Sequence, residues 1–67
     1  MKIINVLGNI ISSSRYCRKD VAVALHVSID TINSWCSNRV QIPVKKAYEI
    51  KALLRLRSIE DIYKEEL

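Results

Sequence analysis

Apolar residues recur at intervals of three and four along most of the chain, which is the spacing expected of amphipathic helices. β-Branched residues do not alternate with polar ones over any long run, and glycine and proline occur once each. The first apolar run predicts a helix of about ten residues that ends at residues 12–14; its apolar members are Ile3, Ile4, Leu7, Ile10 and Ile11. The pattern predicts an all-α fold, a compact bundle of four to five short helices.

The middle of the chain predicts two short helices joined by a tight turn. The first begins within residues 16–18 and ends at Leu25. The chain then turns at His26, and Ser28 has the side chain and the position of an N-cap for the second helix, which continues to about residue 37. Together these segments predict a helix-turn-helix over about residues 18–37, inside a single domain that comprises the whole chain.

The second of these helices has two contrasting sides. At 100° per residue, its apolar side consists of Ile29, Ile32, Trp35 and Cys36. Its opposite side consists of Asp30, Ser34 and Ser37, with Thr31 and Asn33 at the flanks. The apolar side suits a core, and the polar side carries short hydrogen-bonding groups that suit contact with a polar partner.

The remaining part of the chain predicts one long helix and one short one. Asn38 can take the left-handed conformation that closes a helix, and Pro43 fits the first position of a fourth helix over about residues 44–55. The sequence Ser-Ile-Glu-Asp from Ser58 resembles a capping box, so residues 58–67 predict a last short helix. A strand is the alternative for this tail.

Charge is distributed unevenly along the chain. The formal net charge is +4, but residues 1–57 carry ten basic and three acidic residues, whereas residues 58–67 carry one basic and four acidic residues. A basic body favours a polyanionic partner such as nucleic acid. The short acidic tail favours a solvated helix face or a subunit contact.

Several classes of function lack their sequence signals. Cys17 and Cys36 have neither the CxxC spacing nor the His clusters of metal sites, so both are expected to be small, buried, reduced thiols. Paired carboxylates and a glycine-rich phosphate loop are also missing, which predicts no enzyme, no cofactor and no small-molecule ligand. Without a run of about 20 apolar residues or a signal-peptide cleavage region, we expect a cytoplasmic protein and no membrane partner.

The stretch DVAVALHVSIDTINSWCSNRVQIP resembles the helix-turn-helix of Cro-type phage regulators and of the related YdaS-type antitoxin or repressor proteins. The resemblance covers about residues 15–54. It is carried by the small Ala22 at the helix crossing, by Trp35 in the second helix and by the Arg-x-x-Ile-Pro loop that ends at Pro43. The chain departs from the family at His26, where a glycine usually occupies a left-handed turn, although histidine tolerates that conformation.

The resemblance implies a lambda-repressor-like fold and a sequence-specific, double-stranded DNA-binding transcriptional regulator, a repressor of phage or prophage origin. A single recognition helix makes few base contacts, so we expect a homodimer that places two helices about 34 Å apart on a palindromic operator. The tail over residues 58–67 is a candidate dimerisation helix. The alternative is a helical protein-interaction module, such as an antitoxin or an adaptor.

The expected DNA contacts fall into two groups. The base-reading candidates are Ile29, Asp30, Asn33 and Ser34. Among them, Asn33 has the donor and acceptor that adenine requires, and Asp30 either accepts from cytosine or serves only the helix dipole. The phosphate-contact candidates are Arg15, Arg18, Lys19, Ser37, Asn38 and Arg39, with Lys45 and Lys46 as weaker ones.

Overall fold

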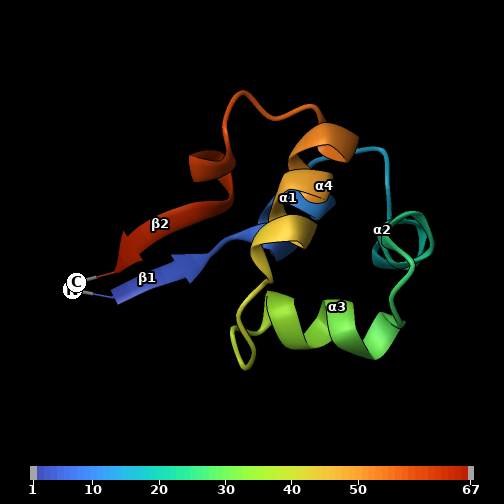
Figure 1. Ribbon diagram of the computed structural model, residues 1–67, viewed down its shortest axis with the longest axis horizontal. Coiled ribbons are helices and arrows are strands. Elements are labelled where there is room, and N and C mark those ends of the chain that lie inside the picture. Colours follow the sequence, from blue (N-terminus) through green and yellow to red (C-terminus); the bar gives the residue numbers. More distant parts are fainter. Residues whose placement is uncertain (1, 67) are drawn as a thin grey trace.

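A computed structural model describes residues 2–66, in which four α-helices pack beside a two-stranded antiparallel sheet (Figure 1). In chain order the elements are β1 (Lys2–Asn5), α1 (Leu7–Ser12), α2 (Arg18–Leu25), α3 (Ile29–Cys36), α4 (Val44–Leu54), the 3-10 helix η1 (Ile59–Ile62) and β2 (Tyr63–Glu66). The sheet projects from one end of the helices, and α3 lies along one edge with α1 and α4 on its inner side (Figure 1).

The all-α prediction is wrong, because the two ends of the described chain form a sheet. β1 pairs with β2 in an antiparallel register that sets Ile3 opposite Glu65 and Ile4 opposite Lys64. The first helix therefore begins at Leu7 and not at Ile3. Ile3 and Ile4 are spaced from Leu7 as helix neighbours would be, but their β-branched side chains also suit a strand, and the distant partner decides between the two.

The tail also differs from the predicted dimerisation helix. Asp61 accepts backbone hydrogen bonds from Arg57 (3.1 Å) and Ser58 (3.3 Å), as a capping box requires, but the turn that follows is a 3-10 helix of only four residues. The carbonyl of Ile62 accepts from the N–H of Val6 at 2.7 Å, which draws the tail toward the N-terminal segment. The alternative of a strand is confirmed for Tyr63–Glu66, whereas residue 67 lies outside the described residues.

The core lies between the helices and receives side chains from each of them. Leu7, Val21, Ile32, Ile50 and Ile62 are completely or almost completely buried, and Ala22, Leu25 and Trp35 join them. The expected burial of Ala22, Ile32 and Trp35 is thus confirmed, whereas Cys36 is half-buried and Ile29 is 41% exposed. Burying the apolar side of α3 fixes which side of this helix faces solvent.

The chain takes a left-handed conformation at His26, in the turn between α2 and α3. His26 is left-handed, with φ 58° and ψ 43°. The N–H groups of His26 and Val27 donate to the carbonyls of Val23 and Ala22, at 3.2 and 3.0 Å, and so close the end of α2. Histidine therefore adopts the conformation that glycine usually supplies at such helix ends.

We expect His26→Gly to stabilise the protein by about 0.5–1 kcal/mol, since a left-handed L-residue costs roughly 1–2 kcal/mol and glycine gives part of this back as unfolded-state entropy. Thermal unfolding followed by circular dichroism measures the change. His26→Ala is the control, because alanine keeps the Cβ and should bring no stabilisation. Equal melting temperatures for the glycine and alanine variants would contradict a conformational cost at this position.

Candidate nucleic-acid interface

The outer side of α3 is an open face of short polar side chains. Ile29, Asp30, Asn33 and Ser37 are exposed, and Ser34 is half-buried. Ile32 and Trp35 lie on the opposite side, in the core. No other element covers the outer side of this helix in Figure 1. We call these five residues, Ile29, Asp30, Asn33, Ser34 and Ser37, the α3 face.

The two ends of α3 are held by side-chain hydrogen bonds. At the start, the hydroxyl of Ser28 accepts from the N–H of Thr31 at 3.1 Å, so the predicted N-cap is confirmed. At the other end, Asn38 has a φ of 61°, which confirms its predicted left-handed conformation. The helix therefore starts and stops where its own sequence specifies.

A pair of asparagines fastens the end of α3 to the sheet. The backbone N–H of Asn5 donates to Asn38 Oδ1 at 2.9 Å, and Asn38 Nδ2 donates to the carbonyl of Asn5 at 3.2 Å. The side chain of Asn5, which is only 6% exposed, donates to the carbonyl of Trp35 at 2.7 Å and accepts from the N–H of Leu7 at 3.2 Å. We call this set of contacts the asparagine clamp.

The clamp changes the interpretation of Asn38. Its amide was expected to contact a phosphate, but both ends of that amide bond to the backbone of Asn5. Its own N–H donates to the carbonyl of Trp35 at 3.0 Å. Asn38 therefore positions α3, with one amide hydrogen left over for a phosphate. Nothing in the local sequence pointed to Asn5, because its partners are 30 and 33 residues away.

Arg18 and Asn33 come together across the helix-turn-helix. Arg18 Nη1, from the start of α2, donates to Asn33 Oδ1 at 2.9 Å. Both residues are exposed. The structure thus joins a predicted phosphate contact to a predicted base contact, a pairing that the sequence did not indicate.

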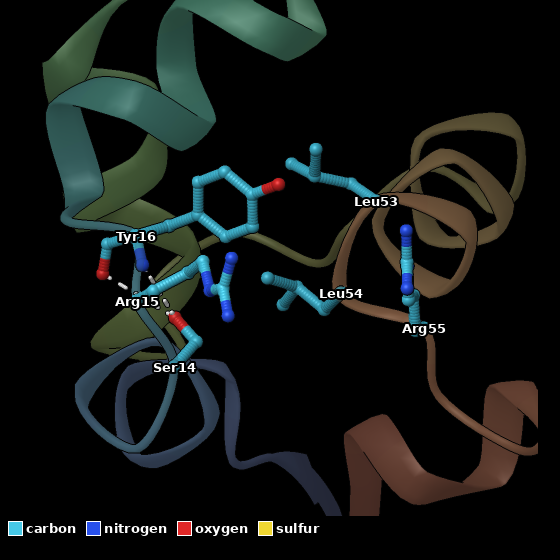
Figure 2. Close-up of a pocket in the computed structure, with 6 residues that line it drawn as sticks. All are labelled: Ser14, Arg15, Tyr16, Leu53, Leu54 and Arg55. Atoms are coloured by element: carbon cyan, nitrogen blue, oxygen red, sulfur yellow. Dashed lines mark hydrogen bonds between the residues drawn. The ribbon is translucent and has the colours of Figure 1, made fainter.

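The other predicted phosphate contacts are placed differently. Lys19 is exposed beside Arg18, and Arg39 is exposed directly after α3. Ser37 is exposed, but its hydroxyl donates to the carbonyl of Ser34 at 3.1 Å, so it must turn before it can donate to a phosphate. Arg15 lies in the α1–α2 loop and borders a pocket of about 310 Å³ with Tyr16, Leu53, Leu54 and others (Figure 2). The structure does not bring Arg15 to the α3 face.

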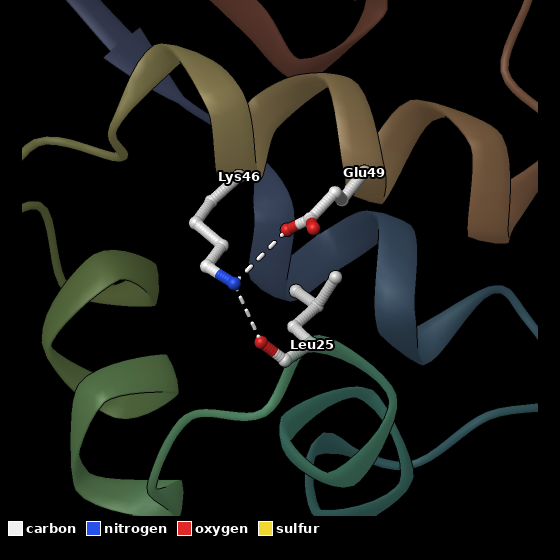
Figure 3. A network of polar contacts seen from close by, with 3 residues as sticks. All are labelled: Leu25, Lys46 and Glu49. Carbon is white, nitrogen blue, oxygen red and sulfur yellow. Dashed lines mark hydrogen bonds and ion pairs between the residues drawn. The ribbon is translucent and has the colours of Figure 1, made fainter.

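The Lys46 side chain bonds to other groups of the protein and is not free to contact a phosphate. Its Nζ donates to the carbonyl of Leu25, at the end of α2, at 2.8 Å and pairs with Glu49 Oε2 at 3.1 Å (Figure 3). This contact ties α4 to the last turn of α2, where a cation suits the negative end of the helix dipole. Of the two weaker phosphate candidates, Lys45 is the exposed one.

We expect Lys46→Met to lower the free energy of unfolding by about 1–2 kcal/mol, because methionine keeps the apolar stem but leaves a buried Glu49 oxygen without its cation. Denaturant unfolding measures the loss. Lys45→Met is the matched control, and it should unfold at nearly the same denaturant concentration as the original protein. Similar midpoints for the two variants would show that Lys46 contributes no interior contact.

The two thiols occupy different environments. Cys17 is exposed just before α2, which corrects the expectation that it would be buried, and Cys36 is half-buried behind α3. Burial raises the pKa of the Cys36 thiol above its ordinary value, and the charge of Arg18 opposes this in part. The backbone N–H of Cys17 donates to the Asp20 carboxylate at 3.2 Å, and this bond, together with the Cys17 side chain and the charge of Lys19, lowers the pKa of the exposed Asp20 carboxyl.

At neutral pH, we expect a thiol reagent such as Ellman's reagent to modify Cys17 well before Cys36. The reason is that the reactive thiolate of Cys36 is both less accessible and less populated. Reaction time courses of the Cys17→Ser and Cys36→Ser variants assign the fast and slow phases. A slow phase that survives in Cys36→Ser would contradict this order.

Across residues 2–66, no helix is both long and apolar enough to cross a membrane. The same part of the chain brings together no group of three or more His, Cys, Asp or Glu side chains of the kind that holds a metal ion. No protein-family model matches the chain, and a search of curated proteins found no match. The functional interpretation therefore depends on the geometry of the α3 face and its surroundings.

Proposed function

We propose that this chain is a sequence-specific regulator that binds double-stranded DNA by inserting α3 into the major groove. The observation that carries the proposal is the α3 face, a row of short polar groups on a helix whose opposite side is buried. A helix fits the major groove, which is about 12 Å wide, and side chains such as Asn and Ser bond to base edges there. Asp30, Asn33, Ser34 and Ile29 are the proposed base contacts.

Exposed cations near the α3 face support the proposal. Arg18 and Lys19 lie at the start of α2, and Arg39 follows α3. Among residues 2–66, none of these three forms an ion pair with a carboxylate. Cations beside a recognition helix can contact the phosphates that border the groove and so fix the position of the helix.

We further propose a homodimer that acts as a repressor of the Cro type in the cytoplasm, where its free thiols stay reduced. Ile3, Val40 and Val44 border one hollow at the sheet end of the molecule, beyond the C-terminal end of α3, and are 60%, 55% and 71% exposed. We call them the apolar end. A second copy on the apolar end would cover these side chains and set two α3 helices along one side of DNA.

Selection of bound duplexes from a random pool tests DNA recognition. We expect a palindromic consensus with half-sites one helical turn apart, and binding that weakens steeply with salt. Arg39→Ala should weaken binding to all duplexes and make the salt slope shallower by about one. Arg57→Ala, a control in the segment after α4, should leave the slope unchanged. Absence of duplex binding at low salt would overturn the proposal and favour a protein-interaction module.

Sedimentation equilibrium tests the dimer. Val44→Glu places a charge on the apolar end and should shift the protein to monomer, with loss of cooperative operator binding. Val23→Glu is the matched control, since Val23 is 68% exposed on α2 and makes no part of the apolar end. A monomeric original protein, or equal association of both variants, would exclude this interface.

A further inference from the structure

The bond between Arg18 and Asn33 fixes which atoms of Asn33 are free. Arg18 Nη1 donates to Asn33 Oδ1, so one of the two lone pairs of the amide oxygen is engaged and the guanidinium charge lies beside the other. The Nδ2 group makes no hydrogen bond within residues 2–66 and keeps two hydrogens to donate. Guanidinium and amide together thus present several N–H donors and a positive charge beside the one acceptor lone pair that remains.

The surroundings of Arg18 favour this arrangement. Its guanidinium passes close to the backbone of α1 at Gly8, where an added Cβ would lie only 3.2 Å from Nη2. It lines a hollow of about 300 Å³ between α1, α3 and β2, which Lys64 also borders and no carboxylate lines. Without an acidic partner there, Asn33 is the group that orients Arg18 on this side of α3.

Resting on the proposed function, we infer that Arg18 and Asn33 act as one unit that reads guanine. In the major groove guanine presents two acceptors, N7 and O6, whereas adenine presents N7 and an N6 donor that needs an acceptor from the protein. The oxygen that would accept from adenine N6 is bonded to the Arg18 guanidinium, whose positive charge attracts the two guanine acceptors and opposes the approach of the adenine donor. The unit therefore favours guanine and replaces the adenine contact that Asn33 alone would make.

Competition binding with duplexes that differ only at the base pair facing Asn33 tests this inference. We expect the original protein to prefer guanine by about 5- to 150-fold, the range given by one bidentate contact. Arg18→Ala removes the guanidinium charge and frees the second lone pair of the amide oxygen, so the preference at this position should change from guanine to adenine. Arg39→Ala, the matched control, should weaken binding to every duplex and keep their order.

The outcomes separate this inference from the proposed function. Sequence-specific binding with adenine preferred by the original protein, or a guanine preference that Arg18→Ala leaves intact, overturns the guanine unit alone. Absence of any duplex binding overturns both. In the free protein, the side-chain amide signals of Asn33 in ¹⁵N-resolved NMR spectra should move in Arg18→Ala and stay in place in Arg57→Ala; unmoved signals in Arg18→Ala would also overturn the pair.

Discussion

Replacing Trp35 with alanine is expected to cost about 3–5 kcal/mol, the usual range for removing a buried tryptophan. Trp35 is 3% exposed and lies on the inner side of α3 beside Ile32. In a chain below about 70–80 residues, one hydrophobic core rarely supplies more than about 3–5 kcal/mol, so the loss would remove most or all of the stability. The variant should be largely unfolded at room temperature and should lose the proposed DNA binding with its fold.

Far-ultraviolet circular dichroism measures this effect, because the substitution removes the one tryptophan of the chain and with it the fluorescence signal. Tyr48→Ala is the matched control, as it deletes another large aromatic ring from a helix but at a site that is 57% exposed. It should remain folded. A folded, helical Trp35→Ala would show that α3 is not held through its apolar side.

Asn5→Ala should have the second largest effect, a loss of about 2–3 kcal/mol. The substitution removes two buried side-chain hydrogen bonds and leaves the N–H of Leu7 without its partner, and each buried polar group left unpaired costs about 1–3 kcal/mol. Because the clamp joins β1 to the end of α3, hydrogen exchange should also become faster in the last turn of α3 than in α2.

Asn9→Ala provides the comparison for Asn5→Ala, since Asn9 is exposed on α1 and makes no side-chain hydrogen bond within residues 2–66. The free energies of unfolding of the two variants, measured by denaturant unfolding, should therefore differ by most of the loss of about 2–3 kcal/mol expected for Asn5→Ala. If both unfold at the same midpoint, the clamp adds little to stability. If Asn5→Ala is less stable but exchange changes evenly along the chain, the clamp does not act on α3 in particular.

The helix-turn-helix could be predicted because its signals are local. Ser28 caps the helix that it precedes, Asn38 turns the chain after α3, and Pro43 stands immediately before α4. Each of these residues determines backbone conformation within a few positions of itself. The polar side of α3 could be predicted for the same reason, since helical periodicity alone separates it from Ile32 and Trp35.

The sheet and the contacts behind the site could not be predicted from local signals. β1 and β2 are about sixty residues apart in sequence, and a four-residue strand such as Lys2–Asn5 carries too little alternation to reveal a partner. Arg18 and Asn33, and likewise Asn5 and Asn38, are separated by 15 and 33 residues. Only the packing of the helices decides that these polar groups meet, and their bonds determine which donors and acceptors the α3 face leaves free.

The pairing of β1 with β2 has a consequence for biosynthesis. β1 leaves the ribosome about sixty residues before β2, its partner strand, and the two strands lie side by side in the folded protein (Figure 1). Until translation reaches β2, β1 has no strand to pair with, and the asparagine that anchors α3 lies at the end of this unpaired segment. A nascent chain can form its middle helices early, but β1, and with it the asparagine clamp on α3, is held in a sheet only once β2 has been made.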